Sequence, residues 1–235
     1  MSDRETDSSA TSVLVATGIR KSYRTPEGSL AVLQGADLQV TSGTILAILG
    51  ASGAGKSTLL NILGTLDRPD AGTVEIAGQR VDDLGERELA RVRATQLGFV
   101  FQFHHLLPEF SAEENVMMPL LIAGAEPGAA RDRAREVLSA VGLKERWLHR
   151  PAELSGGEAQ RVAVARALAP EPRLVLADEP SGNLDQRAAG SLHELVATLA
   201  RERHQTFVVV THNDRLASLA HRVLTLESGR LRETA

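Results

Sequence analysis

The chain has 235 residues, 43% of them hydrophobic and 24% charged, with no cysteine and a net charge of -4. The missing cysteines exclude disulfides, thiolate zinc sites and thiol catalysis, and the acidic balance argues against a whole-surface nucleic-acid binder, so no nucleic-acid partner is expected. No apolar run approaches the roughly 18 residues needed to cross a bilayer.

The N-terminal segment MSDRETDSSATS is polar and lacks the apolar stretch of a signal peptide. We therefore predict a disordered tail over residues 1–12 and a single domain over residues 13–235. The first half of that domain is predicted to consist of strands around one glycine-rich loop. A short apolar run precedes the loop and a helical pattern follows it, which is the order of a P-loop unit. The predicted strands are 13–20, 31–40, 44–49, 73–77 and 97–101, and the predicted helix is 56–66.

Between residues 109 and 169 the pattern changes to helical periodicity, and strand periodicity then returns. Because both flanks have α/β character, the helical stretch is interpreted as an insertion within an α/β core. The predicted helices of the insertion are 113–123, 129–141 and 158–168. After the insertion we predict strands over 173–177, 206–210 and 222–226, and a helix over 186–203.

Residues 50–58, GASGAGKST, match the P-loop pattern G-x-x-x-x-G-K-[ST]. The glycines let backbone N–H groups approach phosphates, and the helix N-terminus adds its positive dipole end. In this motif the lysine reaches the β- and γ-phosphates and the hydroxyl after it ligates magnesium. A glycine-rich turn that binds nothing is the alternative, which the flanking strand and helix disfavour. The predicted nucleotide-binding residues are Gly50, Ser52, Gly53, Gly55, Lys56, Ser57 and Thr58.

An apolar strand ends in two adjacent acids, Asp178 and Glu179. Charges at the end of a buried strand are costly unless they are used. Asp178 suits a magnesium site, directly or through water, and Glu179 is placed to orient and polarise an attacking water. The alternative is a strand that runs into a solvated turn, and the P-loop upstream makes that alternative weaker.

Residues 154–158, LSGGE, precede another predicted helix. Ser155 can cap this helix, and Gly156 and Gly157 expose backbone N–H groups at its positive end, which makes a second phosphate-binding site. One nucleotide does not need two such sites on one protomer, so we expect the second to serve a neighbouring copy. An ordinary helix N-cap is the alternative.

Residues 154–158 resemble the signature motif of ATP-binding cassette (ABC) proteins, and with residues 50–57 and 174–179 the resemblance extends over roughly residues 13–230. It implies an α/β fold: a P-loop NTPase core with an N-terminal antiparallel β subdomain and an inserted α-helical subdomain at about residues 109–169. It also implies an ATPase that uses ATP and Mg²⁺, and that forms a homodimer of cassettes when ATP binds.

The remaining family elements follow in chain order. Tyr23 resembles the aromatic residue that stacks on adenine, and Gln102 resembles the Q-loop glutamine that touches magnesium and the attacking water. Residues 181–185 resemble the D-loop, which crosses to the other protomer. His212 resembles the switch histidine that bonds to the γ-phosphate. The resemblance thus predicts catalytic residues Glu179, His212 and Gln102, and magnesium ligands Ser57, Gln102 and Asp178.

Some of these residues are ambiguous on their own, and one position departs from the family. Tyr23 in isolation is equally a core or surface aromatic, and a lone histidine after a strand, such as His212, is usually structural. At Ala159 the family usually carries a long polar side chain. The ATP contact of the signature motif comes from Ser155 and the backbone, so the shorter side chain is expected to keep that contact, but it can weaken the interface.

The segment 99–110, FVFQFHHLLPEF, is similar to the Q-loop of LolD-type ATPases of the bacterial lipoprotein-releasing transporter, and the similarity continues through residues 113–119. It implies a peripheral protein at the cytoplasmic face of the bacterial inner membrane that powers the release of lipoproteins toward the outer membrane. Two multi-spanning membrane subunits are then expected to contact Phe103–Phe110, a mixed aromatic and aliphatic strip that can accept a short helix. The alternative is that Phe103, Leu106, Leu107 and Phe110 are simply core.

Two other functions stay open. Residues 178–185 also match macrolide or peptide exporters and the cell-division cassette. A soluble, non-transport cassette acting on ribosomes or DNA is a third class, but such proteins generally join two cassettes or insert coiled coils or metal motifs. This chain has one set of motifs, no heptad run and no basic tail. The sequence does not name the cargo.

Overall fold

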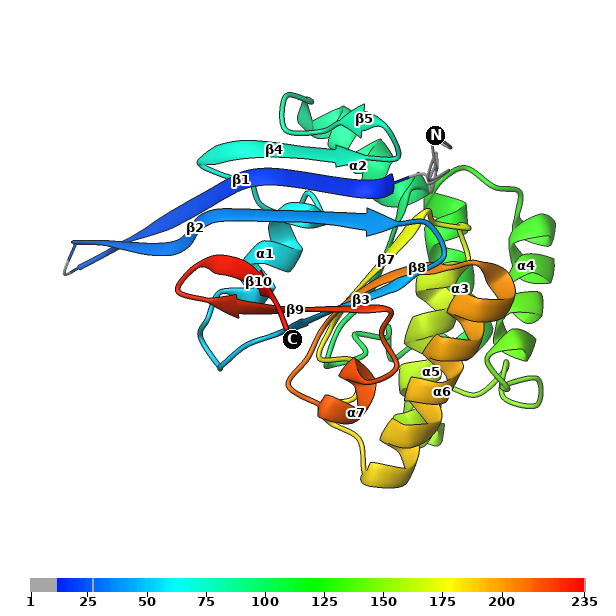
Figure 1. Cartoon of the computed structure of the whole chain (residues 1–235). Coiled ribbons are helices and arrows are strands. Elements are labelled where there is room, and N and C mark those ends of the chain that lie inside the picture. The colour runs from blue at the N-terminus through cyan, green and yellow to red at the C-terminus, as the bar shows by residue number, and fades with distance from the viewer. Residues whose placement is uncertain (1–11, 27, 235) are drawn as a thin grey trace, which may run out of the picture.

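The computed structural model describes residues 12–26 and 28–234, so the predicted tail lies outside the described residues except for Ser12, which begins the first strand. An antiparallel sheet of four strands, in the order β2-β1-β4-β5, forms one layer (Figure 1). Its strands are β1 (Ser12–Thr25), β2 (Gly28–Thr41), β4 (Ala71–Ile76) and β5 (Gln79–Arg80).

The second sheet has six strands in the order β10-β9-β3-β8-β7-β6. All neighbouring pairs in it are parallel except β10 and β9. The carboxyl ends of β3, β6, β7 and β8 therefore meet at one edge, where ligands bind in open α/β sheets. The strands are β3 (Ile45–Leu49), β6 (Leu97–Val100), β7 (Leu174–Asp178), β8 (Thr206–Val210), β9 (Arg222–Glu227) and β10 (Arg230–Glu233).

Each face of the parallel sheet packs on its own hydrophobic core. Strand β8 shows this most clearly, because successive side chains point to opposite faces. Phe207 and Val209 belong to the core shared with the helical stretch, whereas Val208 and Val210 belong to the core shared with the antiparallel sheet. A strand buried on both faces is continuously apolar, as the sequence TFVVV is.

Helices occupy both faces of the parallel sheet. The core beside the antiparallel sheet contains residues of α1 (Lys56–Leu63) and α2 (Glu86–Thr95). The opposite core contains residues of α3 (Ala112–Ile122), α4 (Pro127–Ala140), α5 (Gly156–Leu168) and α6 (Gln186–Arg203), which Figure 1 shows grouped together. Helix α5 contacts α3, α4, α6 and β6, so it joins the helical stretch to the sheet.

The predicted α/β fold is confirmed, but several boundaries and short elements differ. Helix α1 ends at Leu63 instead of residue 66, because Gly64 caps it and Thr65 adopts a left-handed φ of 57°. Helix α2 was not predicted: it buries only Leu89 and Val92, so its apolar periodicity is weak. The short elements α7 (Asp214–Ala217), a 3₁₀ turn at Pro151–Glu153, β5 and β10 were also missed.

None of the helices in the described part of the chain is both long enough and apolar enough to cross a membrane.

Candidate functional site

A cleft of about 670 Å³ opens at the carboxyl edge of the parallel sheet. Loops that follow β3, β6, β7 and β8 reach it from the sheet, and β1 and β2 contribute from the antiparallel layer. All but one of its lining residues were predicted from the sequence. The exception is Val32 of β2, because nothing in the pattern of a strand distinguishes a valine that lines a cleft from any other valine. The lining residues are Tyr23, Val32, Ser52, Gly53, Gly55, Lys56, Ser57, Thr58, Gln102, Asp178, Glu179 and His212.

The glycine-rich loop wraps around the amine of Lys56. The Nζ atom donates to the carbonyls of Gly50 at 2.8 Å and Ala51 at 3.0 Å, and Lys56 is only 9% exposed. Gly55 has φ of 99°, and a Cβ there would lie 2.6 Å from Val32 Cγ1. Glycine is therefore required at this position both for backbone conformation and for the close approach of β2.

Three oxygen-bearing side chains line the cleft together with the lysine: Ser57, Asp178 and Gln102. Burial raises the pKa of Asp178, and the nearby charge of Glu179 raises it further, while the Ser57 hydroxyl and the Lys56 ammonium act in the opposite direction. A buried carboxylate of this kind is stabilised in its charged form by a neighbouring cation. Hydroxyl and carboxylate oxygens are the donors that Mg²⁺ prefers, with phosphates completing its shell, so these residues fit magnesium.

Glu179 and His212 form a pair at the mouth of the cleft. His212 Nδ1 lies 2.7 Å from Glu179 Oε1, and the His212 backbone N–H donates to Oε2 at 3.3 Å. Glu179 has a left-handed φ of 45°, a conformation that costs of order 1–3 kcal/mol for a non-glycine residue. Its backbone is held by a bond from its N–H to Val210 O at 2.9 Å. The carboxylate is thus aimed by contacts on both its main chain and its side chain.

Gln102 is held against the segment that follows Glu179. Its Nε2 donates to Asn183 Oδ1 at 3.0 Å, and Asn183 Nδ2 donates back to the Gln102 carbonyl at 3.2 Å. This reciprocal pair fixes the Gln102 side chain, and with it the direction of the amide oxygen. Two hydrogen bonds therefore join the loop after β6 to the loop after β7.

The structure does not bring Ser155, Gly156 and Gly157 into this cleft. Ser155 and Gly157 line a separate cleft of about 390 Å³ together with Glu158, Arg161 and Asp185, among others. Ser155 caps α5: its hydroxyl accepts from Glu158 N, and the Glu158 carboxylate accepts from Ser155 N and Oγ at 2.9 and 2.8 Å.

The Ser155 backbone N–H and hydroxyl, with the Arg146 guanidinium, lower the pKa of Glu158 to about 2. Since the folded-state pKa is depressed, this carboxylate stabilises the fold above its ordinary value of 4.5, and the contribution is lost as the pH falls toward 2. The α5 N-terminus is thus a charged, well-capped end at neutral pH.

Ala159 lies beneath the surface of the signature motif. Its side chain is 2% exposed and belongs to the core shared with the helical stretch. Ala159 follows Glu158 on α5, and its position on the helix directs its side chain toward the core. The sequence analysis did not predict this burial.

The strip Phe103–Phe110 is mostly exposed. Phe103 is 66%, Leu107 41% and Phe110 37% exposed, but Leu106 is 8% exposed and packs in the core. The interpretation of all four residues as core is therefore wrong for three of them, and the expectation that Leu106 faces a partner is wrong as well. We call Phe103, Leu107 and Phe110 the apolar strip.

Buried polar side chains hold the backbone of this strip. Asn115, fully buried, accepts from Leu107 N at 2.7 Å and donates to the carbonyls of Leu107 and Phe110 at 3.1 and 3.0 Å. Arg166 of α5 donates to the carbonyls of His104 and His105 at 2.7 and 2.6 Å. Exposed apolar side chains on a backbone fixed in this way are typical of a binding surface.

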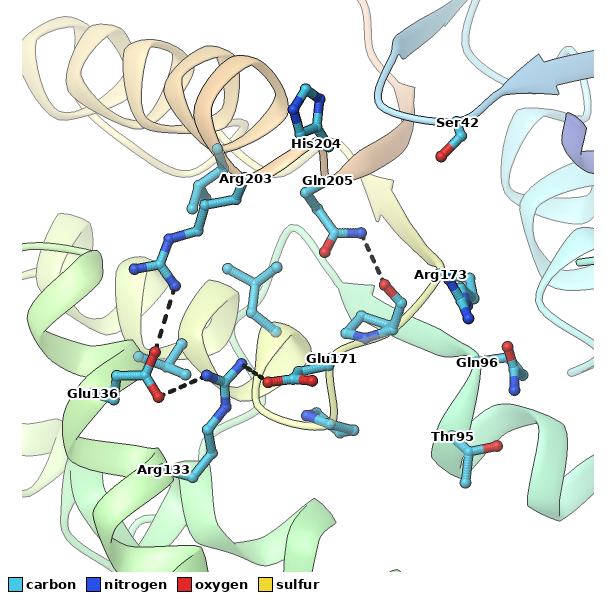
Figure 2. Close-up of a pocket in the computed structure, with 15 residues that line it drawn as sticks. Ser42, Thr95, Gln96, Arg133, Glu136, Glu171, Arg173, Arg203, His204 and Gln205 are labelled. Atoms are coloured by element: carbon cyan, nitrogen blue, oxygen red, sulfur yellow. Dashed lines mark hydrogen bonds and ion pairs between the residues drawn. The ribbon is translucent and has the colours of Figure 1, made fainter. Parts of the chain in front are cut away.

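A second large cleft, of about 840 Å³, lies at the opposite edge of the sheet, beside residues that precede β6, β7 and β8 (Figure 2). No predicted site residue lines it. Four of its charged groups form ion pairs: Arg133 contacts Glu136 at 2.7 Å and Glu171 at 3.2 Å, and Arg203 lies 3.9 Å from Glu136. These ion pairs connect α4 to α6 and to the loop before β7. The charged side chains that line this cleft therefore hold neighbouring elements together.

Comparison with known proteins gives a consistent set of relatives. Residues 33–182 match the family model described as ABC transporter. The lipoprotein-releasing system ATP-binding protein LolD of Geobacter metallireducens is 53% identical over 94% of this chain and 98% of that protein. The protein of the same name from Bacteroides fragilis is 52% identical over 91% and 97% of the two chains.

Solved structures agree with the sequence relatives. The dimeric structure of a bacterial ABC transporter cassette superposes with a TM-score of 0.86 at 39% identity, covering 94% of this chain and 97% of that one. A dimeric post-hydrolysis state of that cassette, bound to ADP and Pi, gives a TM-score of 0.86 at 38% identity over the same shares of the two chains.

Proposed function

The chain belongs to the ABC transporter family, and from this premise we propose that it is the ATP-hydrolysing subunit of a lipoprotein-releasing transporter. The observation that carries the proposal is the convergence of four loops on one cleft. The P-loop, the two acids after β7, Gln102 and His212 all reach it. The similarity to LolD proteins supports the transport process, and the residues of the cleft support ATP hydrolysis.

In this proposal ATP lies in the cleft with its adenine against Tyr23 and its phosphates in the glycine-rich loop. Tyr23 is 40% exposed, and its hydroxyl donates to Asp67 Oδ2 at 3.0 Å, which fixes the ring at the cleft entrance. Lys56 exchanges its bonds to Gly50 and Ala51 for bonds to the β- and γ-phosphates. Backbone N–H groups at the start of α1 complete the phosphate site.

Magnesium would be held by Ser57 and Asp178, with Gln102 beside it. When bound, the ion would neutralise negative charge on the β- and γ-phosphate oxygens. Among the described residues no group of three or more His, Cys, Asp or Glu side chains forms a metal site by itself. A site with few protein ligands that relies on substrate phosphates is the usual arrangement for this ion.

Glu179 orients the attacking water and accepts its proton, and His212 keeps the carboxylate in place through the 2.7 Å contact of its Nδ1 atom. Gln102 positions the same water from the side of the γ-phosphate. Because contacts within the protein hold these groups, little reorganisation is needed in the transition state.

We further propose that two copies pair head to tail when ATP binds. Ser155, Gly156 and Gly157 lie outside the P-loop cleft of their own chain, and the capped N-terminus of α5 offers backbone N–H groups to a phosphate. In a head-to-tail dimer, α5 of one copy faces the P-loop of the other, so each nucleotide contacts both chains. The dimeric structures of the related cassettes support the pairing of two copies.

The whole function is tested by reconstitution. The chain, together with the two membrane subunits expected to accompany it, is placed in vesicles loaded with an acylated lipoprotein, and release is followed with MgATP. We expect release with ATP and none with a non-hydrolysable analogue. Export of a macrolide or peptide, without lipoprotein release, would instead favour the related exporters.

The apolar strip is the proposed contact with the membrane subunits, which places the chain peripherally at the cytoplasmic face of the inner membrane. Leu107→Glu is expected to leave folding and ATP binding unchanged, because Leu107 is 41% exposed. It is expected to prevent assembly, since a carboxylate would be buried in an apolar contact without a partner. Co-purification from detergent-solubilised membranes measures the assembly.

Two matched variants control this prediction. Leu66→Glu places the same charge on a leucine that is 50% exposed elsewhere on the surface, and its complex should persist. Leu106→Glu buries the charge in the core, so it should lower the melting temperature of the isolated chain. A Leu107→Glu chain that still assembles would place the membrane contact on another surface.

A further inference from the structure

A buried histidine lies outside the cleft, on helix α6. His193 is 1% exposed, and its Nε2 atom shares a 2.8 Å hydrogen bond with the hydroxyl of Ser181, itself 6% exposed. Among the described residues its Nδ1 atom has no hydrogen-bond partner. Burial of an imidazole with one nitrogen unpaired costs free energy that a leucine would not cost. The bond to Ser181 is therefore the contact that this histidine is placed to make.

Ser181 begins the segment that connects two residues of the proposed site. Gly182 N, next in the chain, donates to the Glu179 carbonyl at 2.9 Å. Asn183 follows and exchanges two hydrogen bonds with Gln102. The Ser181–His193 hydrogen bond thus attaches this segment to helix α6 at the residue next to Gly182, which contacts Glu179. We call this bond the anchor.

The strained backbone of Glu179 gives this anchor a role. A glutamate with φ of 45° holds that conformation only when surrounding bonds over-determine it. On one side the N–H of Glu179 is bonded to Val210 O, and on the other its carbonyl is bonded to Gly182 N. The second restraint is only as firm as the segment that carries Gly182, and the His193–Ser181 bond ties that segment to α6.

We infer that His193 is a positioning residue for ATP hydrolysis, which holds Glu179 and Gln102 in place by fixing Ser181 on helix α6. The inference rests on the proposed function, because it assigns a geometric support to the same site. Burial, together with the charge of Arg215, lowers the pKa of His193, so the ring is neutral at pH 7. A neutral ring bonds to the hydroxyl in either tautomer, since the hydroxyl can both donate and accept.

The test compares His193→Leu, Ser181→Ala and the double variant. Each single variant is expected to lower the kcat of MgATP hydrolysis about 10- to 100-fold, because small misplacements of positioned groups have effects of this size. The KM for ATP should change less than about twofold, since the phosphate loop is untouched. The double variant should lose no more than the worse single variant, as expected for two partners in one bond. His193→Gln, whose amide can donate to Ser181, should recover most of the kcat.

Controls separate positioning from folding. Val196→Ala, one turn further along α6 at a site 4% exposed, removes core volume without touching a hydrogen bond. It should lower the melting temperature while kcat per ATP-binding site stays normal. If His193→Leu does not fold, Ser181→Ala alone decides, because it removes a single oxygen atom.

Unchanged kcat in Ser181→Ala, or additive losses in the double variant, would overturn the inference. Absence of MgATP hydrolysis by the unaltered chain would instead overturn the proposed function, so the two failures are distinguishable.

Discussion

Glu179→Gln is expected to bind MgATP normally and to hydrolyse it about 10²–10⁴ times more slowly, the range that general-base groups contribute. Glutamine keeps the shape of the side chain and can still accept from the His212 backbone N–H, which lies 3.3 Å from Oε2. It removes the negative charge that accepts the proton of the attacking water. With binding intact and hydrolysis slow, the ATP-bound dimer should accumulate.

Single-turnover hydrolysis and size-exclusion chromatography in MgATP measure the two effects. Glu75→Gln makes the same change on an exposed strand position away from the cleft, and it should alter neither. A Glu179→Gln chain that hydrolyses ATP at the normal rate, or that stays monomeric in ATP while binding it, would contradict the role given to Glu179.

Lys56→Ala is expected to weaken MgATP binding about 10- to 100-fold and to reduce hydrolysis to background. Lys56 is the one lysine or arginine among the described residues that line the cleft. A charge-assisted hydrogen bond contributes about 1.5–3 kcal/mol, so the net loss of one such bond gives an affinity change of this order. Binding is measured by calorimetry, and hydrolysis by phosphate release.

The alanine variant also frees the carbonyls of Gly50 and Ala51, which Lys56 holds at 2.8 and 3.0 Å. Lys56→Met keeps most of the side-chain length without the charge, and so separates packing from electrostatics. Both variants should bind MgATP about 10- to 100-fold more weakly than the unaltered chain. Binding by Lys56→Met at the normal affinity would show that the cleft does not use this cation for phosphate.

Much of the site was predictable because its residues occur in local patterns with a mechanism. The P-loop and the acids after β7 lie next to strands of continuous apolar sequence, and parallel pairing then brings the carboxyl ends of those strands to one edge. Gln102 and His212 carried weak signals of their own. Only their positions after β6 and β8, together with the resemblance to a known family, indicated that they meet in the cleft.

What the sequence did not predict depends on contacts between distant segments. Leu106 and Leu107 are adjacent and chemically identical, yet Leu106 is 8% and Leu107 41% exposed. The buried Asn115, eight positions further on, holds the backbone of Leu107 by bonds to its N–H and its carbonyl. The hydrogen bond between Ser181 and His193 joins a loop to a helical residue 12 positions further along the chain. No sequence pattern indicates that a lone histidine will be buried and make such a bond. Helix α2 was missed because half of its residues are charged and only Leu89 and Val92 are buried, so its apolar periodicity is weak.

The central claim is that each ATP is bound between the P-loop of one copy and Ser155 of another. Mixing Lys56→Ala chains with Ser155→Arg chains tests it most directly. Each homodimer has two damaged sites and should be inactive. Each heterodimer has one site damaged twice and one site with both residues intact, so we predict that ATP hydrolysis returns on mixing, in proportion to the heterodimer formed. No recovery, with heterodimers shown to form by affinity tags on both chains, would contradict the head-to-tail arrangement.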